Sequence, residues 1–168
     1  MEFFDVVKNR YSCRKFTAEK VSDEKLAQIL TAAQQAPTAK NSQPVKIWVI
    51  SSDDALAKIR TATPCHFNAS VILVVGGRES EAFVRPSDGK NYAEIDASIV
   101  ATHIMLAVEA VGLGTTWVGM FDAPKLKELF PEMSEYDLVA LFPVGCKNAE
   151  PAERHFVRKS IDELCRNS

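Results

Sequence analysis

The hydrophobic positions of this chain follow a helical period in some segments and form short continuous runs in others. A helix facing a core repeats apolar residues three and four positions apart, whereas a buried strand is a run of roughly four to eight. The helical spacing predicts helices over 2–9, from Ser22 past Ala33, and over 53–61, 92–111 and 122–130. The apolar runs predict strands over 46–51, 71–75, 114–120 and 138–144. The order of these elements alone leaves the direction of the strands undecided.

The predicted helix over 92–111 differs from the others because its apolar side chains surround most of its circumference. A helix of this kind must be buried on several sides. A second copy of the chain would supply the missing cover, so we expect a homodimer that pairs this helix across a twofold axis, with Ile104 and Val108 at the interface. The alternative is a central core helix in a monomer.

Composition and charge restrict the class of protein. The 168 residues fit one domain over 1–168, and 20 Lys and Arg against 22 Asp and Glu leave a net charge of −2. Without a long basic stripe, nucleic acid is not expected as a partner. The longest aliphatic run, 71–75, is far shorter than the ~20 residues that span a bilayer. Residues 1–5 lack the basic start of a secretory signal, so we expect a soluble, cytoplasmic protein without a membrane partner.

The chain carries no recognisable catalytic or metal motif. Its four cysteines have neither zinc nor redox spacing, so free thiols and no metal site are expected. Glycine-rich nucleotide loops and the Gly-x-Ser-x-Gly nucleophile motif do not occur in the sequence. An enzyme with this sequence must therefore perform its chemistry without a side-chain nucleophile.

Two segments have the composition of a ligand site. Arg10, Ser12 and Arg14 offer two guanidinium groups and a hydroxyl, a suitable donor set for a phosphate dianion. The alternative is a solvated helix end. The loop over 37–44 combines a hydroxyl with two carboxamides between two prolines, which suits the mixed polar edge of a planar heterocycle. The alternative there is an ordinary connector.

Two further segments are less specific. Gly119 has no side chain, so the backbone could approach a flat ring closely there, while Trp117 is either a core residue or a stacking partner. Residues 154–160 form a run rich in Arg and Lys in an acidic chain, a pattern that is usually solvated surface.

In this order, the four segments resemble the nitroreductase family of FMN flavoproteins, and the resemblance covers nearly the whole chain. It implies an α+β fold, a nitroreductase-like mixed β-sheet flanked by helices on both faces, in an intertwined homodimer with FMN at the subunit interface. It also implies three groups of cofactor-binding residues, which are Arg10, Tyr11, Ser12, Arg14 and Arg158 near the phosphate and ribityl chain, Pro37, Thr38, Asn41 and Gln43 along the isoalloxazine, and Trp117, Val118 and Gly119 near N5.

The resemblance implies an oxidoreductase in which no side chain is catalytic, because the flavin N5 carries the chemistry. Hydride would pass from NADH or NADPH to a small acceptor, of nitroaromatic or quinone type, by a ping-pong mechanism. Two alternatives stay open: a non-catalytic flavin-binding or regulatory protein, and a specialised relative of dehalogenase-like or flavin-consuming type. The chain is short for the family and has Val45 where many members carry an aromatic residue, which leaves the substrate open.

Overall fold

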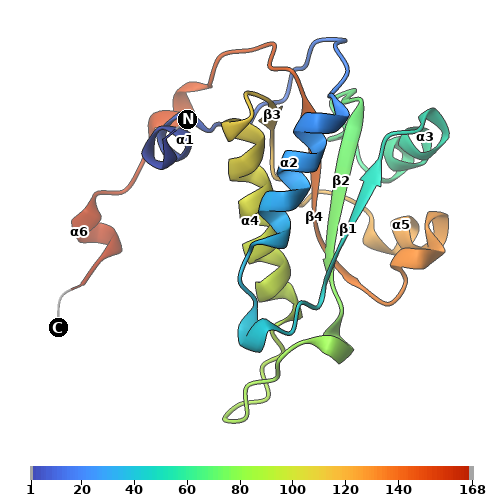
Figure 1. Ribbon diagram of the computed structural model, residues 1–168, viewed down its shortest axis with the longest axis vertical. Helices are drawn as coiled ribbons and strands as arrows, with labels where there is room; N and C mark the ends of the chain where they lie inside the picture. Colours follow the sequence, from blue (N-terminus) through green and yellow to red (C-terminus); the bar gives the residue numbers. More distant parts are fainter. Residues whose placement is uncertain (1, 167–168) are drawn as a thin grey trace.

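The computed structural model describes residues 2–166, which form helices around one small sheet (Figure 1). The helices are α1 (Phe3–Asn9), α2 (Asp23–Gln34), α3 (Asp53–Ala62), α4 (Ala93–Ala110), α5 (Ala123–Leu129) and α6 (Ile161–Leu164). The strands are β1 (Val45–Ile50), β2 (Val71–Gly77), β3 (Gly114–Thr115) and β4 (Asp137–Gly145). Ser22, Ser52 and Asp122 cap α2, α3 and α5 by accepting a backbone N–H in the first turn.

The four strands lie in the order β1-β2-β4-β3, and each neighbouring pair is antiparallel. The two central strands are almost entirely buried, in register with Leu73 opposite Phe142. One isolated parallel bridge joins Ser12 to Thr115 beside β3. The α+β class is therefore confirmed, and the mixed character of the sheet is limited to this bridge.

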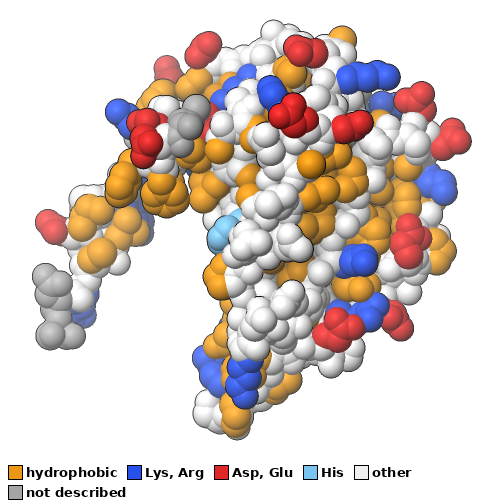
Figure 2. All heavy atoms as spheres, viewed as in Figure 1, with side chains coloured by type: hydrophobic (Ala, Val, Ile, Leu, Met, Phe, Trp, Pro, Cys, Tyr) orange, Lys and Arg blue, Asp and Glu red, His pale blue; other side chains and the backbone are white. Residues whose placement is uncertain are grey.

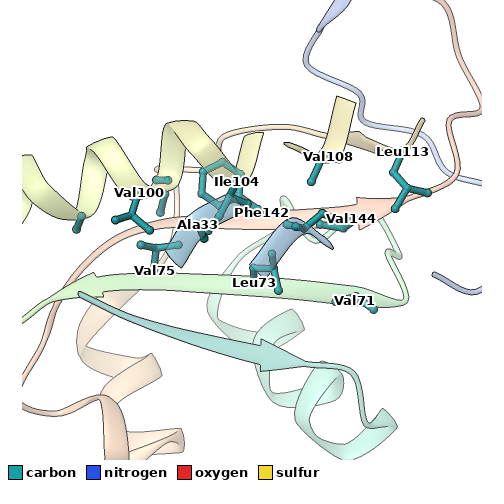
Figure 3. Packing of buried hydrophobic residues seen from close by; sticks show 14 residues of the cluster. Ala33, Val71, Leu73, Val75, Val100, Ile104, Val108, Leu113, Phe142 and Val144 are labelled. Carbon is teal, nitrogen blue, oxygen red and sulfur yellow. The ribbon is translucent and has the colours of Figure 1, made fainter. Parts of the chain in front are cut away.

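Helices cover both faces of the sheet, as predicted. Alternate residues of a strand point to opposite faces. On one face Leu73 and Val75 meet α2 and α4 (Figure 3). On the other face Ile72 and Val74 pack in a second cluster with residues of α3 and α5.

The helix predicted over 92–111 is confirmed as α4. The two residues expected at the dimer interface, however, face the sheet of their own chain. Ile104 and Val108 are both 0% exposed and point toward β2 and β4 (Figure 3). They belong to the core of a single chain, so the prediction that they lie at a dimer interface is wrong. Periodicity revealed that α4 is apolar all round, but not which side the sheet covers. Ile95, Ile99 and Leu106 occupy other sides of α4 and remain half-buried.

The strand predicted over 114–120 is much shorter in the structure. Only Gly114 and Thr115 pair continuously with β4, and Val118 then forms an isolated bridge with Leu141. Two residues lie between them, and in this register the first, Thr116, lies opposite Pro143. Proline has no N–H to donate, so the ladder is interrupted at that position.

The C-terminal segment leaves the sheet after β4 and ends in α6, which stands away from the other helices (Figure 1). Its apolar side chains are exposed, by 71% at Phe156, 71% at Ile161 and 66% at Leu164. Figure 2 shows hydrophobic side chains gathered on this arm. The arm, residues 146–166, therefore presents apolar surface that the rest of the described chain does not cover. Among residues 2–166, no helix combines the length and the apolar character needed to cross a bilayer.

Candidate functional site

The predicted phosphate-side residues converge in one cavity of about 220 Å³. It is lined by Arg10, Tyr11, Ser12, Arg14, Ala152, Arg154, His155 and Arg158. Arg154 and His155 belong to residues 154–160, a run whose composition is typical of solvated surface. Local sequence patterns could not place these two residues beside Arg10, because nearly 150 positions separate them along the chain, and the family resemblance pointed only to Arg158. We call Arg10, Ser12, Arg14, Arg154 and Arg158 the basic cluster.

The chain holds the N-terminal part of the basic cluster against β3 and the arm. Arg10 ends α1, and the Cys13 N–H donates to the Thr115 carbonyl at 2.9 Å. The Tyr11 hydroxyl donates to the Ala149 carbonyl of the arm. These contacts hold residues 11–13 next to both β3 and the C-terminal arm.

A buried ion pair supports the same region from the end of α4. Both carboxylate oxygens of Glu109 accept from Lys147 Nζ at 2.7 Å, and the Glu109 side chain is only 6% exposed. Lys147 Nζ also lies 5.2 Å from the centroid of the Tyr11 ring. Burial, followed by the charge of Cys13, raises the pKa of Tyr11 to about 12. Tyr11 is thus a neutral hydrogen-bond donor at ordinary pH.

The backbone of the loop over 37–44 is strained. Lys40, Asn41 and Gln43 have φ of 53°, 54° and 51°, in the left-handed region that side chains other than glycine rarely adopt. Thr38 Oγ1 accepts the Gln43 N–H at 3.0 Å. The side chains of Asn41 and Gln43 are exposed, so their carboxamides are available to a ligand. We call residues 37–44 the carboxamide loop; Thr38 and Gln43 also line a groove of about 260 Å³ beside β1.

A buried carboxylate in the first turns of α4 holds this loop. Asp96 is 1% exposed, and its Oδ1 accepts the Ala39 N–H at 2.9 Å. Its Oδ2 has no hydrogen-bond partner within the described chain. Neither Asp96 nor Glu109 was predicted as a site residue, although acids in a mainly apolar helix are a signal of buried polar contacts.

The segment after β3 exposes backbone at Gly119. A Cβ added there would meet no atom within 4 Å, so a flat molecule has room to approach. Val118 is buried and pairs with Leu141. The Trp117 ring packs edge-on against Phe142 with centroids 5.3 Å apart, which is a core contact. A contact of Trp117 with a cofactor stays a prediction.

The three groups do not form one pocket within a single chain. Asp96 holds the carboxamide loop near the start of α4, whereas Glu109 supports the basic cluster at its end (Figure 1). These two residues are 13 positions apart, which corresponds to about 20 Å along a helix axis. The parallel bridge from Ser12 to Thr115 instead places the basic cluster on the same strand edge as Val118 and Gly119.

No group of three or more His, Cys, Asp or Glu residues that could hold a metal ion occurs in the part of the chain that the structure covers. The cysteines at 13, 65, 146 and 165 are free thiols. The site is therefore built from guanidinium groups, hydroxyls, carboxamides and backbone.

Comparison with known proteins is consistent with this architecture. The model of the nitroreductase family matches residues 7–69 and 64–146. A nitroreductase family protein of Clostridium difficile superposes with a TM-score of 0.92 and 32% identity, over 99% of this chain and 98% of that one. A protein of Exiguobacterium sibiricum, solved in complex with FMN, has a TM-score of 0.86 and 23% identity, over 100% and 98%. A protein of Methanothermobacter thermautotrophicus, provisionally named NADH dehydrogenase/NAD(P)H nitroreductase, is 26% identical over 92% of this chain and 82% of its own length.

Proposed function

This chain belongs to the nitroreductase family, and we propose that it is an FMN-dependent oxidoreductase. In this proposal it passes hydride from NADH or NADPH through flavin N5 to a small acceptor of nitroaromatic or quinone type, by a ping-pong mechanism. The observation that carries the proposal is the convergence of the basic cluster in one cavity on the strand edge that leads to Gly119.

The basic cluster fits the phosphate of FMN. Guanidinium groups of Arg10, Arg14 and Arg158 can bind phosphate oxygens in pairs, and the Ser12 hydroxyl adds a further donor. The chain has no glycine-rich turn of the kind that binds a pyrophosphate. We therefore infer that FMN binds in preference to FAD.

The segment at Gly119 fits the ring edge. Within residues 2–166, the N–H groups of Gly119 and Met120 donate to no protein acceptor. Unpaired backbone donors beside the open space at Gly119 can stabilise negative charge on a bound ring without a catalytic side chain. FMN, when bound, supplies hydride acceptance and donation at N5; the chain binds the cofactor, orients it and leaves one side open to substrates.

We infer that the carboxamide loop reaches the flavin from a second copy of the chain. Within one chain about 20 Å of α4 separates the residues that support the two groups, so Thr38, Asn41 and Gln43 would contact the ring bound by the partner's basic cluster. The exposed apolar side chains of the arm and of α1, where Phe4 is 82% exposed, support an intertwined homodimer. The free thiols support a cytoplasmic location.

Anaerobic titration of the FMN-loaded protein with NADH and NADPH tests the activity. Loss of the yellow flavin absorbance, with return of the colour on adding a quinone or nitroaromatic, is the expected result. Flavin that stays oxidised would instead favour a non-catalytic flavin-binding protein. Reduction without reoxidation by these acceptors would point to a specialised relative that acts on one metabolite. Tighter binding of FAD than of FMN would contradict the assignment of the cofactor.

A further inference from the structure

A buried threonine at the end of α3 holds the segment that carries Gly119. Thr63 is 2% exposed, and its Oγ1 donates to the Met120 carbonyl at 2.6 Å. The Cys65 N–H donates to the same Oγ1 at 3.0 Å. An amide N–H can only donate, so the single hydroxyl proton of Thr63 is directed to Met120. The direction of both hydrogen bonds is therefore fixed.

The segment over 118–122 is fastened at three points. Val118 exchanges two backbone hydrogen bonds with Leu141, both at 3.0 Å. Thr63 holds the Met120 carbonyl, and the Asp122 N–H donates to the Ala62 carbonyl at 2.9 Å. The N–H groups of Gly119 and Met120 lie between these points and stay free within the described residues. The three contacts thus set the direction of two donors without occupying them.

We propose that Thr63 is a positioning residue, which orients the free N–H groups of Gly119 and Met120 toward the flavin edge by holding the Met120 carbonyl. This inference rests on the proposed function. Donors stabilise developing charge most when their direction is fixed before the charge appears. Thr63 therefore favours the reduced over the oxidised cofactor without touching it.

The ordinary role for Thr63 would be to satisfy backbone groups where α3 ends. That role affects the stability of the fold, but it gives no reason for the bound cofactor to change its reduction potential. The midpoint potential of bound FMN therefore separates the two roles, and it does not depend on turnover.

The test compares the potential of FMN bound to wild type, Thr63→Val, Thr63→Ser and Thr61→Val, by reductive titration against a reference dye. Valine keeps the size of threonine but removes the hydroxyl, whereas serine keeps the hydroxyl. Thr61 is the matched control, because its exposed hydroxyl donates to Lys58 within α3 at 2.8 Å. If the Thr63→Val variant folds poorly, the potentials of Thr63→Ala and Thr63→Ser can be compared instead, because these two variants also differ in the hydroxyl.

We expect Thr63→Val to lower the preference for reduced over oxidised FMN about tenfold, which is a potential about 30 mV lower for a two-electron couple. Thr63→Ser and Thr61→Val should keep the wild-type potential. Two results would overturn the role of Thr63 while leaving the proposed function intact. One is a wild-type midpoint potential of FMN bound to Thr63→Val, and the other is an equal shift of the potential in Thr63→Val and Thr63→Ser. A wild-type protein that binds no FMN, or whose FMN no nicotinamide reduces, would overturn the proposed function itself.

Discussion

The exposed arm offers a direct test of the proposed dimer, through the substitution Ile161→Ala in α6. Ile161 is 71% exposed in the single chain, and α6 stands away from the sheet and its helices (Figure 1). Removing an exposed side chain from a monomer changes its free energy of unfolding by no more than about 0.5 kcal/mol. If the protein were a monomer, this substitution would therefore have almost no effect.

In a dimer that covers the arm, the same substitution acts on the association free energy. Burying an isoleucine side chain is worth about 1.5–3 kcal/mol. A twofold dimer contains two arms, so one substitution removes about 3–6 kcal/mol from association. The dissociation constant of the dimer should then rise about 10²- to 10⁴-fold.

Sedimentation velocity over a range of protein concentrations measures this change, with FMN content followed by flavin absorbance. Val49→Ala is the matched control, because Val49 is 38% exposed on β1 and lies outside the arm. We expect Ile161→Ala to dissociate at concentrations where the control is dimeric, and to lose FMN as it dissociates. Wild-type protein that sediments as a monomer at micromolar concentration with one FMN per chain would refute the shared site. If Ile161→Ala has the dissociation constant of the wild type, the arm is not part of the dimer interface.

Three further predictions concern the basic cluster and its support. Arg10→Ala and Arg158→Ala should each weaken FMN binding by about 1.5–3 kcal/mol, measured by titration calorimetry, with little change in the Tm of the apoprotein; unchanged affinity in both would show that these arginines are only solvated. Lys147→Met should destabilise the fold by about 3–5 kcal/mol in urea unfolding, because it leaves the Glu109 carboxylate buried without its partner, and adding Glu109→Gln should recover part of the loss. The pKa of Tyr11, raised from 10.0 to about 12, means that its contribution to stability is complete below pH 10 and is lost as the pH rises toward about 12. The free energy of unfolding of Tyr11→Phe should therefore fall less than that of the wild type between pH 10 and about 12. An equal fall in the two proteins would contradict this contribution of Tyr11.

Most of the helices and strands could be predicted from the sequence, because their signals are local. The helix predicted over 92–111 is α4, and the run over 71–75 is the buried strand β2. One exception is the strand over 114–120, whose ladder depends on the residue opposite it. That residue is Pro143, about thirty positions away, and no periodicity within the strand reveals it.

The residue types of the candidate site were also visible in the sequence, since phosphate binding requires cations and ring recognition requires mixed donors and acceptors. The cavity around Arg10 and Arg158 contains the residues that were expected there. What the residue types could not provide was their relative position. The resemblance implied a site shared by two subunits but not which segments one chain supplies to it; in the structure α4 separates the carboxamide loop from the basic cluster.

The sequence by itself thus determined which elements form and which chemistry the side chains offer, because both depend on neighbours a few positions away. Only the tertiary structure decided that Ile104 faces the sheet, that Asp96 holds the carboxamide loop while Glu109 pairs with Lys147, and that Thr63 supports the backbone beside Gly119. The physical reason is that the order and direction of strands in a sheet set which distant segments meet. Hydrophobic periodicity records that a side chain is buried, but not which part of the chain buries it.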